Sequence, residues 1–181
     1  MSRHAKPKLL PVILTALLLA AVPGTSVAGQ AQTAKTWLHV ALHAADAWAD
    51  DAQLVWVEND ASMDAEGRAE AWGFLFFSPQ LHAMRSYSIR DGALVHAQDQ
   101  PLTVAAPPIR AWLDSDVVTP TALRRAADTW GEGSRLETLL LVRGIFAETD
   151  AWVAVFARDE GPRLFVVCDA ESGDVLRAWK G

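Results

Sequence analysis

Two segments of the chain carry apolar residues at helical spacing. In the first, Trp37, Ala41, Ala44 and Trp48 form one face, because positions three or four apart share a side of a helix. In the second, Thr119 is a suitable N-cap and Pro120 suits the first helical position. Gly131 and Gly133 follow and are expected to end that helix. The pattern therefore predicts one helix near residues 36–48 and another near 119–130.

Each predicted helix is followed by short apolar runs that are typical of strands. The runs cover residues 54–57, 71–77, 84–89 and 93–96 after the first helix, and 136–142, 151–157, 164–168 and 174–178 after the second. Large rings alternate in 71–77, where Trp72, Phe74 and Phe76 share one side. Gly92 and Gly173 lie between the last two runs of each set, where a hairpin turn requires a positive φ.

Short matches recur at a nearly constant offset. Ala45-Asp46-Ala47-Trp48 returns as Ala127-Asp128-Thr129-Trp130, 82 positions later, and Ala71-Trp72 returns as Ala151-Trp152, 80 positions later. We interpret this as a duplication. The predicted fold class is α+β, with two repeated units (29–97 and 119–181), each one helix on a three- to four-stranded antiparallel sheet, packed as a pseudo-dimer. The second face of 136–142 would then be covered by the sister unit.

The segment between the predicted units, residues 98–118, is expected to be an extended linker. Pro101, Pro107 and Pro108 favour an extended backbone. Trp112 and Leu113 are expected to hold the segment against the body of the protein.

The first 28 residues have the three-part layout of a secretory signal peptide. Arg3, Lys6 and Lys8 precede an apolar stretch over 9–22, and Ser26-Val27-Ala28 places small residues before a cut at Gly29. The apolar stretch is shorter than the roughly 20 residues that cross a bilayer, although an uncleaved anchor is the alternative. No cysteine lies near the cut, which excludes lipid attachment there. We expect an exported protein of the periplasm.

Composition narrows the class of protein further. The chain has 16 basic and 22 acidic residues, and removal of residues 1–28 takes away three basic and no acidic side chains, so that the net charge falls from −6 to −9. A nucleic-acid-binding protein needs a basic face, so we expect no such partner. The chain has one cysteine, which excludes an intramolecular disulfide framework.

Two stretches resemble a known family. Residues 166–176, Val-Val-Cys-Asp-Ala-Glu-Ser-Gly-Asp-Val-Leu, are similar to the closing hairpin of PepSY domains, and residues 64–76 resemble the loop and second strand of PepSY-like exported proteins. Residues 88–92 depart from the family's turn. The resemblance implies a helix-plus-sheet module that binds or restrains a peptidase or another exported partner. It implies no catalytic residues.

Two groups of side chains are candidate metal sites. His39 and His43 are four apart on the predicted helix, and Asp46 and Asp50 lie nearby, so that the group suits a metal. The alternative is a solvated polar helix face. Residues 60–67 place oxygens at alternate positions like a calcium loop, but Ala65 stands where that loop needs glycine. The alternative is a polar loop that turns at Gly67.

The sequence offers one candidate nucleophile and no catalytic motif. Cys168 follows four apolar residues, which favours a buried thiol over a nucleophile. The chain has no Gly-x-Ser-x-Gly motif, phosphate-binding loop or paired-glycine dinucleotide motif. Trp72, Phe74, Phe76 and Trp152 either line a ligand cleft or, as is commoner for alternating rings, belong to the core.

The sequence therefore predicts an exported, non-enzymatic binding or regulatory module without cofactor, whose partner is a protein or peptide. The expected contact residues are Asp46, Asp50, Asp51 and Trp112. Their acidic charge favours a basic partner. The alternatives are a carrier of a small ligand or metal, with His39 and His43 as ligands, and an enzyme of a type that these motifs do not reveal.

Overall fold

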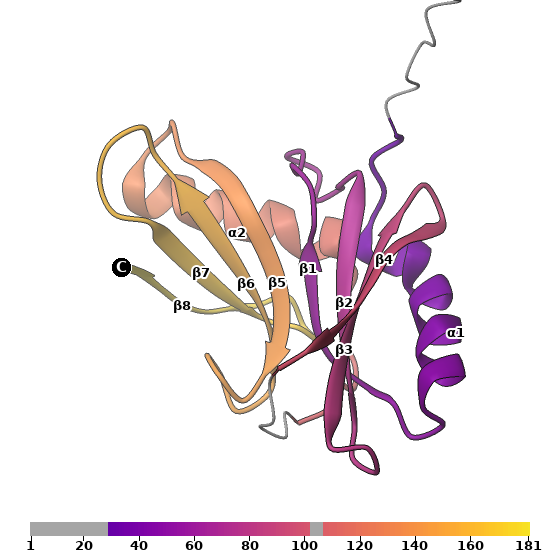
Figure 1. Ribbon diagram of the computed structural model, residues 1–181. Helices are drawn as coiled ribbons and strands as arrows, with labels where there is room; N and C mark the ends of the chain where they lie inside the picture. The colour runs from indigo at the N-terminus through magenta and orange to yellow at the C-terminus, as the bar shows by residue number, and fades with distance from the viewer. Residues whose placement is uncertain (1–28, 102–106) are drawn as a thin grey trace, which may run out of the picture.

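The computed structural model describes residues 29–101 and 107–181, so the predicted signal peptide and its cleavage site lie outside the described residues. The elements in chain order are η1 (Ala34–Trp37), α1 (Leu38–Trp48), β1 (Gln53–Asn59), β2 (Ala71–Ser78), β3 (Ala83–Arg90), β4 (Ala93–Gln100), α2 (Ser115–Trp130), β5 (Arg135–Arg143), β6 (Asp150–Ala157), β7 (Leu164–Asp169) and β8 (Val175–Lys180) (Figure 1).

All eight strands belong to one antiparallel sheet, in the order β4-β3-β2-β1-β5-β6-β7-β8. The predicted fold class, two repeated helix-on-sheet units packed as a pseudo-dimer, is therefore wrong: the fold is β-rich, with one large sheet and two short helices. The two halves of the sheet join where Trp56 and Val57 of β1 lie opposite Val142 and Leu141 of β5. This pairing satisfies backbone groups that two separate sheets would each leave open at an edge.

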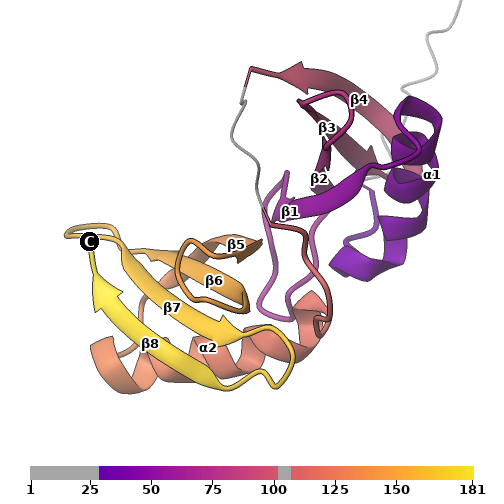
Figure 2. The same ribbon diagram turned by 90° about the horizontal axis from the view of Figure 1, so that it is seen from below.

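Both helices lie on the same side of the sheet, which bends near β1 and β5 (Figure 2). α1 contacts β2, β3 and β4, and α2 contacts β6, β7 and β8. The main core fills the space between the helices and the sheet, and it includes the alternating rings of β2 together with the indole of Trp152, all at most 1% exposed. Their assignment to the core is confirmed. Neither helix in the described ranges is long and apolar enough to cross a membrane.

The start of α2 differs from the prediction. The helix begins at Ser115, and the side chain of Asp114 caps it by accepting a hydrogen bond from Ser115 N at 2.8 Å. Thr119 and Pro120, predicted as the N-cap and first position, lie inside the helix, because Asp114 supplies a stronger cap five positions earlier. The predicted end is confirmed: Gly131 has a φ of 78° and its N–H donates to Ala127 O.

The opposite side of the sheet, which we call the open face, carries neither of the helices that the described residues form (Figure 2). The prediction that a sister unit covers β5 on this side is wrong. Phe146 and Ala147, from the loop between β5 and β6, pack there instead, against a cluster that includes Val142 and Val153. The ring of Phe146 also lies 6.0 Å from that of Trp179. This loop, together with the rings of Trp56, Phe165 and Trp179, thus covers the second apolar side of β5 and β6.

The segment before α2 ties the two halves of the molecule together. Ile109 N donates to Leu54 O of β1 at 2.8 Å, and Leu113 N donates to Ala170 O at 2.6 Å. The indole of Trp152 donates to Leu113 O at 2.9 Å. The ring of Trp112 packs edge-on against that of Trp152, at 5.6 Å. The prediction that Trp112 and Leu113 hold this segment against the body is confirmed.

Candidate functional site

A groove of about 350 Å³ lies on the open face over the first half of the sheet. Most of its lining residues have the same strand parity, because alternate side chains of a strand point to the same face. They are Trp56, Glu58 and Asp60 from β1 and its end, Gly73 and Leu75 from β2, Ser86 and Ser88 from β3, and His96 and Gln100 from β4. The buried residues Phe74 and Tyr87, which have the opposite parity, complete the lining.

Gly73 leaves the floor of the groove open. It lies between Glu58 on β1 and Ser88 on β3 in the strand register. A Cβ at this position would meet nothing closer than Glu58 O at 3.7 Å, which is an ordinary contact. The absence of a side chain here therefore creates space without being required by the backbone.

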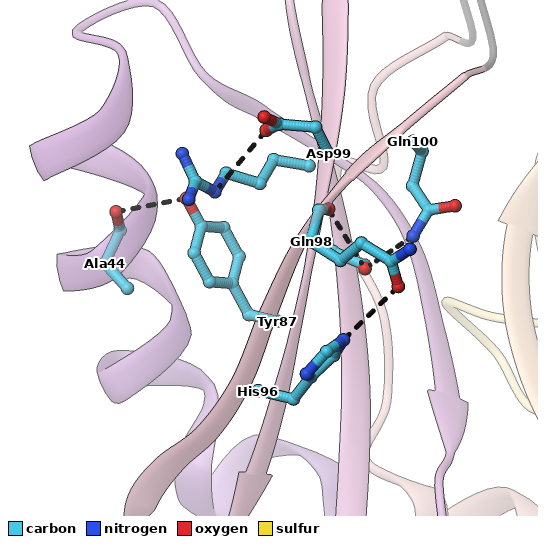
Figure 3. A network of polar contacts seen from close by, with 8 residues as sticks. Ala44, Tyr87, His96, Gln98, Asp99 and Gln100 are labelled. Carbon is cyan, nitrogen blue, oxygen red and sulfur yellow. Dashed lines mark hydrogen bonds and ion pairs between the residues drawn. The ribbon is translucent and has the colours of Figure 1, made fainter.

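Hydrogen bonds hold the polar wall of the groove in place. On β3 and β4, Gln100 Nε2 donates to Ser86 Oγ at 2.8 Å, and His96 Nε2 lies 3.3 Å from Gln98 Oε1 (Figure 3). Figure 3 also shows that Tyr87 and Asp99 point the other way, toward α1, where the Tyr87 hydroxyl donates to Ala44 O. The wall facing the groove is thus distinct from the buried side of the same strands.

Two carboxylates line the end of the groove near β1. The indole N–H of Trp56 donates to Glu58 Oε2 at 2.7 Å, and the Ser88 hydroxyl donates to Asp60 Oδ2. Within residues 29–101 and 107–181, no Lys or Arg side chain forms an ion pair with Glu58 or Asp60. This end of the groove therefore carries negative charge that the protein does not neutralise at short range.

The predicted metal residues do not assemble into a site. His39 and His43 are exposed on α1, and the described part of the chain contains no group of three or more His, Cys, Asp or Glu side chains placed to hold a metal. In the loop after β1, Asp64 Oδ1 accepts hydrogen bonds from Glu66 N and Arg68 N. Gly67 turns the chain there with a φ of 79°. This geometry is that of the polar loop that was the alternative to a calcium site.

The predicted contact residues fall into two groups. Asp46 and Asp50 are exposed at the end of α1. Asp51 instead accepts hydrogen bonds from Ser78 Oγ at 2.6 Å and Gln80 N at 2.7 Å, and the bond from Ser78 lowers the pKa of its carboxyl. Trp112 is half-buried against the core. The structure thus assigns internal partners to Asp51 and Trp112, and a contact role for Asp46 and Asp50 stays a prediction.

Cys168 is 1% exposed and belongs to the main core. Burial is the main cause that raises the pKa of its thiol to about 11, with a smaller contribution from the charge of Asp174. A nucleophilic cysteine needs the opposite, an accessible thiol with a lowered pKa. The prediction that this cysteine is buried and structural is confirmed.

Most of the groove residues were missed by the sequence analysis. Asp60 was considered only as part of a loop, and Glu58, Ser86, Ser88, His96 and Gln100 were not singled out. Their spacing in the sequence places them on shared strand faces, since Trp56, Glu58 and Asp60 occupy alternate positions, as do Ser86 and Ser88. Alternation shows which residues share a face of one strand, but it does not show which strands are neighbours.

No family model matches the chain, and no curated protein matches it. The crystal structure of a candidate lipoprotein from Clostridium difficile 630 is similar in fold, with a TM-score of 0.57 and 10% sequence identity over 80% of this chain and 92% of the other. At that identity the likeness shows the fold alone. The resemblance to PepSY domains stays a prediction.

Proposed function

We propose that the protein is an exported, non-enzymatic binding module that receives a protein or peptide partner in the groove over β1–β4. Export is supported by the basic, apolar and small-residue pattern of residues 1–28. It is also supported by the likeness in fold to a protein described as a candidate lipoprotein. The resemblance to PepSY domains supports a partner that is itself an exported protein.

The binding role is argued from the shape and the charge of the groove. It is open at Gly73, walled by the half-buried Trp56, and lined by the carboxylates of Glu58 and Asp60, for which no ion-pair partner occurs in the described ranges. A carboxylate that is not neutralised at a concave surface attracts a complementary group from a partner. An aromatic wall adds apolar contact area to such a surface.

A small ligand is the second candidate, and the size of the groove favours it. Its volume of about 350 Å³ lies at the lower end of the range of roughly 300–1,000 Å³ that is usual for small-molecule sites. A small ligand and a partner chain would use the same floor and wall. The two functions are therefore separated by what binds, rather than by where it binds.

The test fills the groove without disturbing the fold. Gly73→Val adds a side chain to the floor at a position where a Cβ meets only ordinary contacts, and valine suits a strand. Ala157→Val on β6 is the matched control, because it places the same valine side chain on the same face outside the groove. Each immobilised protein is exposed to envelope extract of the source cell, and retained proteins and small molecules are identified by mass spectrometry.

We expect one identified protein to be retained by the wild type and by Ala157→Val, and to be lost from Gly73→Val. Equal retention by all three would place binding elsewhere and overturn the proposal. Retention of a small molecule alone, with the same dependence on Gly73, would assign the groove to the second candidate. Turnover of a peptidase, esterase or phosphatase substrate by the purified wild type, abolished in Gly73→Val, would show an enzyme.

A further inference from the structure

Within the described residues, the polar side-chain atoms left without a partner at the β1 end of the groove are all hydrogen-bond acceptors. The indole N–H of Trp56 is already used by Glu58, and the hydroxyl hydrogen of Ser88 is already used by Asp60. Among the described residues, no donor reaches Oε1 of Glu58, Oδ1 of Asp60 or the lone pairs of the Ser88 hydroxyl. All of these atoms accept hydrogen bonds, and none donates one. A group that binds there must supply donors.

Charge selects among donor-rich groups. Guanidinium and ammonium groups offer five and three N–H donors, have no acceptor, and carry the positive charge that Glu58 and Asp60 lack nearby. A neutral hydroxyl group brings acceptors of its own, which would face the carboxylates. Hydrogen bonds between a cation and a carboxylate are also roughly twice as strong as those between neutral groups.

The rest of the groove suits the stem of a long basic side chain. Leu75 and the ring of Trp56 are half-buried apolar surfaces beside the open floor at Gly73. The methylene groups of lysine and arginine pack on such surfaces while the charged end reaches polar atoms. A cation close to the face of an indole gains a further electrostatic attraction.

From this geometry we propose that the groove binds a basic side chain, arginine or lysine, presented by a peptide segment of the partner. The inference rests on the proposed function and specifies its chemistry. The side chain lies over Gly73, with its stem beside the neighbouring pair Trp56 and Leu75. Its cationic end donates to Glu58 and Asp60. The amide of Gln100 at the β4 end, which can both donate and accept (Figure 3), faces the backbone of the bound segment.

The test uses two heptapeptide libraries with random flanking positions. One has arginine at the centre, and the other has citrulline, which keeps the shape of arginine and lacks its charge. Each library is passed over the immobilised protein that begins at Gly29, and retained peptide is quantified. The variants are Glu58→Gln and Asp60→Asn, which keep an oxygen acceptor for Trp56 and Ser88. Asp128→Asn, an exposed acid on α2 outside the groove, is the control for net charge.

We expect the wild type to retain the arginine library at least about fivefold better than the citrulline library, as for a partly exposed charge pair. Glu58→Gln and Asp60→Asn should each remove most of this difference, and Asp128→Asn should preserve it. Far-UV circular dichroism of each variant confirms the fold. Equal retention of the two libraries, retention of neither, or an equal loss in Asp128→Asn would overturn the inference.

A free organic cation offers the same charged donor group as a basic side chain. Binding of agmatine distinguishes a free cation from a peptide. Agmatine has the guanidinium and stem of arginine without a peptide backbone. Agmatine that binds as tightly as the retained peptides would assign the groove to small cations and overturn the peptide source. If the identified envelope partner depends on Gly73 while the two libraries are retained equally, the proposed function stands and only the basic side chain is wrong.

Discussion

Replacement of Trp152 by phenylalanine tests whether the central indole holds the segment before α2 against the sheet. Trp152 is 1% exposed, and its Nε1 donates to Leu113 O at 2.9 Å. Its ring packs edge-on against Trp112 at 5.6 Å and Trp72 at 6.5 Å. Phenylalanine keeps an aromatic ring on β6 but removes the N–H donor and part of the ring area.

The cost has two parts. The part-buried carbonyl of Leu113 loses its donor, which costs about 1–3 kcal/mol when no other donor replaces it. The smaller ring weakens two edge contacts, each about 0.5–1.5 kcal/mol when intact. Together we expect a loss of about 2–4 kcal/mol in the free energy of unfolding. For a chain of this size that corresponds to a fall in Tm of about 5–15 °C.

The assay is urea unfolding of the protein that begins at Gly29, followed by far-UV circular dichroism. Trp130→Phe is the matched control, because Trp130 is half-buried at the end of α2 and its indole forms no hydrogen bond to the described residues. It should cost no more than about 1 kcal/mol. If Trp152→Phe is no more destabilising than Trp130→Phe, the hydrogen bond to Leu113 does not hold this segment.

Three further outcomes are expected. Cys168→Val should leave the Tm unchanged within a few degrees. The wild-type thiol, with its pKa raised to about 11, should resist a thiol reagent at pH 8. Rapid labelling would show that the thiol is accessible. Asp51→Asn should lower stability at neutral pH. The bond from Ser78 lowers the pKa of the Asp51 carboxyl below its ordinary value of about 3.8. The carboxylate therefore stabilises the folded protein above that ordinary value, and this stabilisation is lost as the pH falls through the lowered pKa. The stabilities of the wild type and Asp51→Asn should accordingly converge in acid. Gly67→Ala should lower the free energy of unfolding in urea by about 2 kcal/mol or more, because φ is positive and the new Cβ would lie 2.5 Å from Ser115 O. An unchanged urea midpoint would show that the loop backbone adjusts to the new side chain.

The sequence by itself determined the local elements. Alternation of large rings identified β2 and the side of it that is buried, because a strand has a period of two. Glycine with a positive φ marked the turns at Gly92 and Gly173 and the end of α2 at Gly131, because other residues are strained there. The aliphatic neighbours of Cys168 were enough to place it in the core. Each of these conclusions depends on interactions within a few residues.

Only the tertiary structure decided how the strands are joined. Nothing in the local pattern of β1 or β5 distinguishes an edge strand from one that pairs on both sides, so the sequence analysis separated two sheets that Trp56–Val142 and its neighbouring pairs unite. The groove has the same origin. Glu58, Gly73 and Ser88 lie far apart in the chain, and they become neighbours because β1, β2 and β3 pair in one particular register. That register depends on long-range backbone hydrogen bonds and on burial of one face of the sheet, which no short segment encodes.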